Sequence, residues 1–368
     1  MYSNNVEWSN LTFMFYCALI IISSLTTQLS NKYLKLRNKR CNITIVLLTI
    51  ILILIKVFNT TGRDISVIGG YQYNFYSATS MNNFMDQGVE FGFKILTVII
   101  RHVTSDFNCY LVILGIMYIL PIIYMLNKYR ENIDLFSTVL FYFTVFLFPS
   151  FSPLRQCLAA SIGLLAFDKM VEKKAAQCIF WLIIAVMFHS SALVLVIPFF
   201  CVFFKAMNRK MITFMIILIF TAFMVVKNSI FSFFLGNSRY IGYSMAGNGI
   251  GLEQIVYFAP IVALIIYNRK NMENHYVKIN YAYVFSAFCF GLLSYIITVF
   301  GRLYITYLPL MFIIGFNIKT LKSTNSKYKW LINLIICLYC SLRFWMYISR
   351  YYNLENLMPY TNLLGWII

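Results

Sequence analysis

Three arginines interrupt otherwise apolar stretches of the chain. Arg155 stands in "FPSFSPLRQCLAASIGLLAF", and Arg302 and Arg343 lie at or just inside the ends of two further apolar runs. An ionisable side chain at such a place is costly unless it faces a cavity or a partner. The planar guanidinium binds phosphate through two parallel hydrogen bonds and stays charged near lipid. The three arginines therefore indicate a cavity that binds a polyanion, such as a lipid diphosphate.

Of the three arginines, Arg155 is the strongest candidate for an anion-binding residue. It follows Pro153, whose ring favours the start of a helix, so we expect Arg155 in the first helical turn. Unpaired backbone N–H groups and the positive end of the helix dipole would reinforce an anion site there. The alternative is that each arginine only extends its head group to the membrane–water interface.

Two side chains could take a proton from a sugar hydroxyl near this cavity. Asp64 adjoins Arg63 after the second apolar run, and His189 lies in "FHSSA" between two short ones. Either group could be a general base, and His189 could instead donate to a phosphate. The alternatives are that Asp64 pairs with Arg63 or caps a turn, and that His189 bonds to a facing helix.

Tyrosines are frequent in the longer segments between the apolar runs. Tyr71, Tyr73 and Tyr360 are candidates for sugar binding, because their rings can stack on the apolar faces of sugars while their hydroxyls bond to sugar hydroxyls. The competing explanation is the aromatic belt at the membrane interface. Arg239 and Arg63 join Arg343 as further candidates for substrate binding.

Several motifs of other protein classes are missing. The chain has no Walker motif, no dinucleotide-binding glycine pattern and no DxD pair, which disfavours nucleotide-driven transport and metal-dependent transfer from nucleotide sugars. Cys337 and Cys340 form a CxxC within an apolar run, with no second pair or histidine nearby. A zinc or redox role for this pair is therefore not expected.

The elements that must position these residues are membrane helices. The 368 residues are 61% hydrophobic and 11% charged, and apolar runs recur along the whole chain. Several runs approach the roughly 20 residues needed to cross a bilayer, and they are too long and too apolar for barrel strands. We predict an all-α polytopic membrane protein, with about twelve transmembrane helices in a single transmembrane domain over residues 1–368.

The formal net charge is +18, and the basic residues that produce it lie mainly in the loops between apolar runs. Most lysines and arginines lie in alternate short loops, so the positive-inside rule makes those loops cytoplasmic and places both termini outside. No nucleic-acid partner is needed to explain the charge. The outward basic residues are mostly arginine: Arg63, Lys94, Arg101, Arg155, Lys227, Arg239, Arg302, Arg343 and Arg350.

Three outward segments are longer than a turn. Residues 59–106 include the amphipathic stretch "KILTVIIRHVT", for which we expect a re-entrant or interfacial helix. Residues 227–253 form a glycine-rich loop that is expected to move, and residues 347–368 form a tyrosine-rich tail. We expect Arg302 and Asp64 to approach Arg155 from other parts of the chain at this outward side.

A series of short motifs resembles one known family. "GRD" followed by a tyrosine cluster, "VEFGFKIL", "SPLRQCLAASIGLLAF", "AVMFHSSALVLVIPFF", "FGRLYITYLPLMF" and "MPY" together resemble the EpsG family of Wzy-type polysaccharide polymerases, from about residue 55 to the end. The positions that carry over are Asp64, Glu90, Arg155, His189, Arg302 and Tyr360. In the family a tyrosine follows the aspartate more closely than Tyr71 follows Asp64 here.

The resemblance implies an inner-membrane polymerase of O-antigen or exopolysaccharide repeat units with a glycosyltransferase C-type fold. Its substrates would be a donor and an acceptor glycan on undecaprenyl diphosphate, joined at the periplasmic face, and a chain-length regulator is a further candidate partner. A diphosphate leaving group stabilised by arginines needs no obligatory metal or other cofactor. An O-antigen ligase and a flippase of lipid-linked glycan are the alternative functions.

Overall fold

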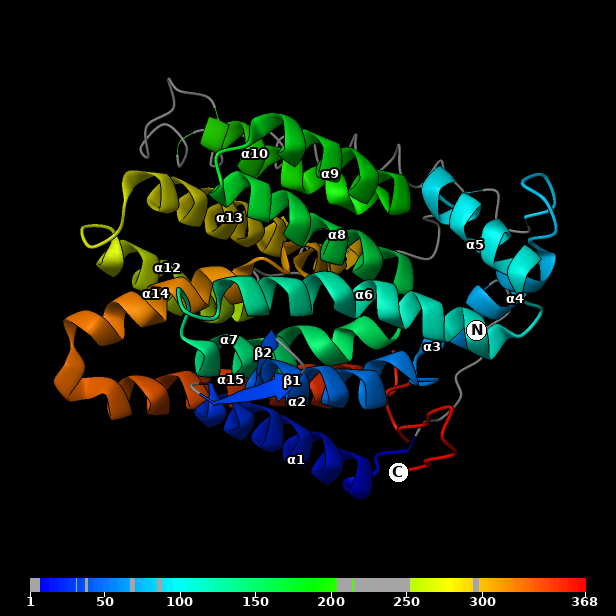
Figure 1. Ribbon diagram of the computed structural model, residues 1–368, viewed down its shortest axis with the longest axis horizontal. Helices are drawn as coiled ribbons and strands as arrows, with labels where there is room; N and C mark the ends of the chain where they lie inside the picture. The colour runs from blue at the N-terminus through cyan, green and yellow to red at the C-terminus, as the bar shows by residue number, and fades with distance from the viewer. Residues whose placement is uncertain are drawn as a thin grey trace.

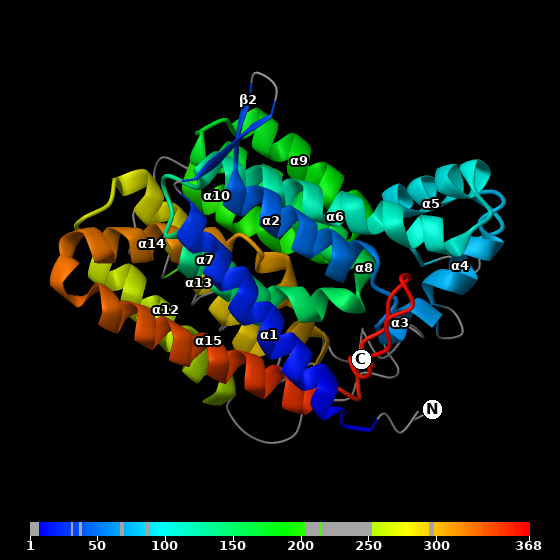
Figure 2. The same ribbon diagram turned by 60° about the horizontal axis from the view of Figure 1, so that its bottom comes forward.

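The computed structural model describes residues 7–30, 32–36, 39–66, 70–84, 88–203, 214, 252–293 and 298–368. It is an assembly of helices that run in roughly common directions, with α8 in its interior (Figures 1 and 2). The outward loop expected over 227–253 lies outside the described residues except for the first residues of α12.

Within the part of the chain that the structure describes, three helices are long and apolar enough to cross a membrane. They cover Asn10–Leu29, Phe107–Tyr129 and Ser326–Tyr351. Shorter apolar helices cover Ile43–Val57, Leu135–Phe151, Ala175–Phe188, Ser190–Phe203 and Gln254–Asn268. The prediction of a helical membrane protein is therefore confirmed, whereas the total of about twelve spans stays a prediction.

The first part of the chain contains a β-hairpin, which the all-helical prediction did not include. Its elements are α1 (Asn10–Thr26), η1 (Thr27–Leu29), β1 (Tyr33–Leu36), β2 (Lys39–Asn42), α2 (Ile43–Leu52) and η2 (Ile53–Val57). The loop after η1 folds into a two-stranded antiparallel hairpin, in which Tyr33 faces Asn42 and Leu36 faces Lys39. Asn42 then caps α2 by accepting a hydrogen bond from the Ile45 N–H.

The rest of the described chain consists of helices joined by turns and loops, with isolated β-bridges between Asn59 and Asn362 and between Thr361 and Ile367. Its elements are α3 (Arg63–Ser66), α4 (Tyr71–Ser77), α5 (Phe91–Val103), α6 (Phe107–Tyr129), α7 (Leu135–Phe141), η3 (Tyr142–Leu147), η4 (Phe148–Phe151), α8 (Leu154–Val171), α9 (Ala175–Phe188), η5 (Ser190–Leu195), α10 (Val196–Phe203), α12 (Leu252–Asn268), α13 (Asn274–Leu293), η7 (Thr298–Tyr307), α14 (Leu310–Thr324), η8 (Ser326–Tyr328) and α15 (Lys329–Tyr351).

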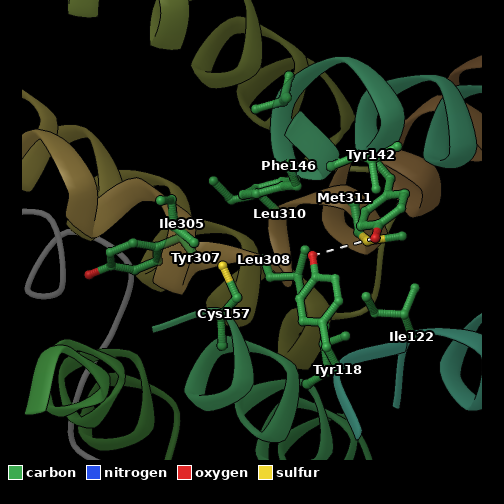
Figure 3. Packing of buried hydrophobic residues seen from close by; sticks show 14 of the residues in the cluster. Tyr118, Ile122, Tyr142, Phe146, Cys157, Ile305, Tyr307, Leu308, Leu310 and Met311 are labelled. Atoms are coloured by element: carbon green, nitrogen blue, oxygen red, sulfur yellow. Dashed lines mark hydrogen bonds between the residues drawn. The ribbon is translucent and has the colours of Figure 1, made fainter. Parts of the chain in front are cut away.

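Helix α8 lies at the centre because its surface is made of small and apolar side chains. Ala159, Ala160 and Gly163 let neighbouring helices approach closely, and α8 packs against α6 and α9. A Cβ atom at Gly163 would come within 2.7 Å of Leu195 Cδ1. Figure 3 shows Cys157 of α8 in a core with Tyr118 of α6 and Leu308, and this packing fixes the start of α8.

One end of the bundle carries α3, α4 and α5, in which α4 packs against both neighbours and α3 lies beside the C-terminal segment (Figure 2). We call it the site end. Helix α5, which covers most of the predicted amphipathic stretch, buries Phe93 and Ile100 and exposes Phe91, Ile99 and Val103. The C-terminal segment is tied to this end, since the Leu363 N–H donates to the Phe58 carbonyl over 2.8 Å.

The opposite end carries the basic loops, and we call it the basic end. Asp168 is buried there, 2.6 Å from Lys128 Nζ and 2.9 Å from Lys169 Nζ. The Tyr129 hydroxyl donates to the same carboxylate over 2.8 Å, and Glu172 also pairs with Lys128. These contacts join the ends of α6 and α8, so the helices are fixed in register from the end opposite to the site.

Gly62 permits the close approach that places α3. Its φ is +133°, and a Cβ atom would lie 2.4 Å from the Phe151 carbonyl oxygen. We expect Gly62→Ala to lower the melting temperature of the purified protein, because the backbone strain of about 1–3 kcal/mol adds to a backbone clash. The matched control is Gly365→Ala, since Gly365 has φ +83° with open space around it. Equal melting temperatures for the two variants would contradict the role of the close approach.

Candidate functional site

A carboxylate at the site end joins an arginine to a histidine. Arg155 Nη1 donates to Glu90 Oε2 over 3.1 Å. His189 Nδ1 lies 2.8 Å from the other carboxylate oxygen, Oε1. The side chains of Arg155, Glu90 and His189 are 24%, 15% and 25% exposed, so the group is half-sheltered yet reachable. We call these three residues the Arg–Glu–His cluster.

Each member of the cluster stands at the end of a helix. Arg155 is the second residue of α8, as Pro153 predicted. Glu90 is the N-cap of α5, and His189 is the C-cap of α9. The cluster therefore depends on three chain segments that meet at the site end. The Ser190 N–H also donates to Glu90 Oε1 over 3.1 Å, which ties the segment after α9 to the start of α5.

Glu90 is ionised throughout the physiological pH range. Burial alone would raise its pKa, but the contact with His189, the charge of Arg155 and the hydrogen bond from the Ser190 amide outweigh burial and lower the pKa to about 2. This carboxylate therefore accepts hydrogen bonds from its partners, and it does not act as a general acid.

The Tyr71 side chain holds the backbone of Arg155 in place. Its phenol oxygen accepts a hydrogen bond from the Arg155 backbone N–H over 3.1 Å, and its ring meets the Phe93 ring edge-on. Burial raises the pKa of Tyr71 to about 12, with the charge of Arg155 lowering it and that of Asp64 raising it. The neutral phenol is buried and holds the first turn of α8, whereas Tyr73 is 43% exposed.

Asp64 lies near the cluster but is paired elsewhere. Its Oδ1 atom is 3.3 Å from Arg63 Nε, so the alternative given above for Asp64, a pair with Arg63, is present. Its backbone N–H donates to Ser152 Oγ over 3.3 Å, three residues before Arg155. Arg63 is held further by the Leu354 carbonyl. Asp64 is therefore placed beside the start of α8, in contact with an arginine other than Arg155.

Comparison with protein families decides what kind of chain this is. The model of the EpsG family matches residues 41–362, which include every member of the cluster. The chain belongs to the EpsG family. Comparisons with curated proteins and with solved structures give no match. Membership of the EpsG family supports a membrane-bound, glycosyltransferase-like polymerase of polysaccharide repeat units.

The EpsG-family chain carries a second polar group beside the cluster that the sequence analysis missed. Thr306 Oγ1 accepts from Gln156 Nε2 over 3.2 Å and lies 3.1 Å from Ser191 Oγ. Gln156 and Ser191 follow directly on Arg155 and Ser190, so this contact brings η7 to the first turn of α8. Local sequence patterns do not reveal this contact, because Gln156 and Ser191 are 150 and 115 residues away from Thr306 along the chain.

The remaining candidates of the EpsG-family chain are not all brought to the cluster. Arg302 lies on η7, four residues before Thr306, but its side chain is outside the described residues, as is all of Arg239. The Arg343 guanidinium packs over the Tyr257 ring at 3.4 Å. The expected convergence of Arg302 with Arg155 therefore stays a prediction.

Tyr360 is placed differently from the expectation of a sugar-binding ring. It is 0% exposed, and its hydroxyl donates to the Ile55 carbonyl over 3.1 Å. Its ring packs against Phe15 and Tyr16. In this EpsG-family structure Tyr360 anchors the C-terminal segment against η2 and α1, and its ring offers no face to a ligand.

Within the described part of the EpsG-family chain, no three histidine, cysteine, aspartate or glutamate side chains gather as a metal site. Cys337 is half-buried and Cys340 is buried, both on α15 among apolar neighbours.

Proposed function

We propose that this protein polymerises oligosaccharide repeat units carried on undecaprenyl diphosphate. The growing glycan moves from its lipid diphosphate to the non-reducing end of a new lipid-linked unit, at the periplasmic face of the bacterial inner membrane. The single observation that carries the proposal is the Arg–Glu–His cluster. It combines an anion-binding guanidinium with an oriented imidazole in a chain of the EpsG family.

Arg155 is proposed to bind the donor diphosphate. Its first-turn position adds the positive end of the α8 dipole to the charge of the guanidinium. Negative charge grows on the diphosphate as the glycosidic carbon–oxygen bond breaks, and a fixed cation stabilises that charge most in a sheltered site. Arg302, on the neighbouring η7, is proposed to bind the same diphosphate from the other side.

His189 is proposed as the general base. Glu90 Oε1, 2.8 Å from Nδ1, favours the tautomer with the proton on Nδ1 and leaves the Nε2 lone pair to accept a proton. The acceptor hydroxyl oxygen forms the new bond to the anomeric carbon and gives its proton to Nε2. The bond to the diphosphate breaks, and undecaprenyl diphosphate leaves with the electron pair. Asp64 is the second candidate for the base, because it lies beside the start of α8.

The proposed orientation follows from the two ends of the bundle. The cluster is at the site end, while the paired and exposed lysines of the loops after α6, α8 and α14 lie at the basic end. The positive-inside rule places the basic end in the cytoplasm, so the cluster faces the periplasm. We also propose a glycosyltransferase C-type architecture, in which outward loops bind the glycan.

A reconstituted assay separates this function from its rivals. The purified protein in liposomes receives one synthetic undecaprenyl-diphosphate-linked repeat unit as its substrate. A polymerase produces a ladder of longer glycans, an O-antigen ligase produces nothing without lipid A core, and a flippase moves the substrate but leaves it chemically unchanged. Absence of elongation by protein that binds the substrate would refute the proposal.

Chelation tests how the leaving group is stabilised. We expect the ladder to form at an unchanged rate in an excess of EDTA. Arg155 supplies the charge that a divalent ion supplies in other transferases. The control is a metal-dependent glycosyltransferase treated in parallel, which should stop. A tenfold or larger loss of elongation that added Mg²⁺ restores would contradict the metal-independent mechanism.

A further inference from the structure

An apolar groove lies between α12, α14 and α15, away from the Arg–Glu–His cluster. It has a volume of about 380 Å³, and its walls include Leu264, Ile314, Ile318, Ile332 and Ile336. Figure 2 shows α12, α14 and the start of α15 on the side of the molecule away from α4 and α5. The lining is almost wholly hydrocarbon, so a ligand in this groove would be an alkyl chain.

The groove is closed toward the site end. The Tyr339 hydroxyl of α15 donates to the Tyr257 carbonyl of α12 over 2.7 Å. One turn further along α15, the Arg343 guanidinium covers the Tyr257 ring at 3.4 Å. These two contacts join α12 to α15 on the side of the groove that faces the site end. A chain in the groove therefore enters from the surrounding membrane or from the basic end, and not along α15 from the site end.

Three cations lie next in sequence to the helix ends that form the groove at the basic end. Arg269 and Lys270 follow α12 directly, and Lys329 begins α15 one turn before Ile332, on the same helix face. All three side chains are exposed. Tyr267 and Trp330, also exposed, flank them as aromatic residues do at a membrane interface. An apolar groove with three exposed cations at the ends of its helices is complementary to an anionic lipid, which has a charged head group and hydrocarbon chains.

We propose that this groove binds an anionic diacylphospholipid from the leaflet at the basic end. One acyl chain lies between α12, α14 and α15, and the phosphate meets Arg269, Lys270 and Lys329. A lipid held there joins three helices that otherwise leave open space between them. The proposal does not depend on the polymerase function, because none of these residues belongs to the cluster.

Native mass spectrometry of the full-length protein, stripped of lipid in detergent, tests the proposal with three probes. They are phosphatidylglycerol, phosphatidylcholine with the same chains, and undecaprenyl diphosphate. We expect one tightly bound phosphatidylglycerol. In the R269Q/K270Q/K329Q variant its affinity should fall by about 100-fold, since each cation near a charged lipid is worth roughly fivefold. Lys173→Gln, an exposed lysine elsewhere at the basic end, should change the affinity less than twofold.

A second variant tests the groove itself. Ala263→Trp fills the groove from an exposed wall position and should abolish the bound phospholipid, whereas Leu338→Trp, exposed on α15 outside the groove, should not. Equal binding of phosphatidylcholine, or binding that survives both the charge variant and Ala263→Trp, would overturn the proposal. Binding of undecaprenyl diphosphate that Ala263→Trp removes, without selective phosphatidylglycerol binding, would overturn it in favour of a substrate groove.

Discussion

Replacing Arg155 by alanine should leave only single-repeat glycans on the lipid carrier in a polymerase-null strain. The substitution removes the guanidinium proposed to hold the donor diphosphate and leaves the rest of the cluster in place. Loss of one such donor typically costs 10²- to 10³-fold in rate. Gel ladders of the extracted glycans measure the outcome directly, and the same loss should appear as a fall in kcat with the purified protein.

The contacts around Arg155 make this test interpretable. The hydrogen bond to Tyr71 comes from the backbone of residue 155, so it persists in the alanine variant. Glu90 keeps His189 and the Ser190 amide as partners. We therefore expect near-normal amounts of folded protein in the membrane.

Two further variants control the experiment. Arg155→Lys keeps a positive charge but loses the two-pronged geometry, and it should retain only part of the activity. Arg130→Ala removes an arginine at the basic end, which pairs with Glu131, and should leave the ladder intact. Long ladders from Arg155→Ala at normal protein levels would refute the assignment of the diphosphate to Arg155.

Two members of the Arg–Glu–His cluster, Arg155 and His189, could be predicted from residue type and from the positions of helix ends. Pro153 predicted the start of α8, and an arginine in an apolar run predicted a partner for Arg155. His189 was found because it stands between two short apolar runs, and it is indeed at the end of α9. Such features are local, so the sequence alone displays them.

The partners themselves could not be read from the sequence. Glu90 is 65 residues from Arg155 and 100 residues from Ser190 along the chain. Their meeting depends on how α5, α8 and α9 pack, which periodicity does not specify. The sequence analysis therefore considered Asp64 as the neighbour of Arg155, whereas the structure gives Arg155 to Glu90 and Asp64 to Arg63.

Two buried charges also depend on partners that the sequence does not reveal. Lys56 reads as a lysine near a helix end, but it is 3% exposed, donates to the Ser150 carbonyl and lies 5.2 Å from the centre of the Tyr118 ring. Asp168, near the end of α8, is buried between two lysines and a tyrosine. Both depend on partners that only the packed bundle supplies.

The second large effect is expected from His189 and Glu90 together. His189→Ala should reduce kcat by about 10²- to 10⁴-fold, because the general base is lost. Glu90→Gln has the same shape without the charge, and it should reduce kcat by about 10²-fold or more with a smaller change in KM, because the imidazole is no longer held in the productive tautomer. Initial rates on the synthetic lipid-linked unit supply both constants.

The double variant distinguishes a catalytic pair from two independent supports. If Glu90 acts through His189, Glu90→Gln combined with His189→Ala should cost about as much as His189→Ala alone. Additive losses would mean that Glu90 serves the fold or Arg155 and not the base. Asp64→Asn tests the second candidate for the base, a carboxylate beside the same helix start with a different partner. If Asp64→Asn abolished elongation while His189→Ala retained it, the proton would go to Asp64, and the proposed role of His189 would be wrong.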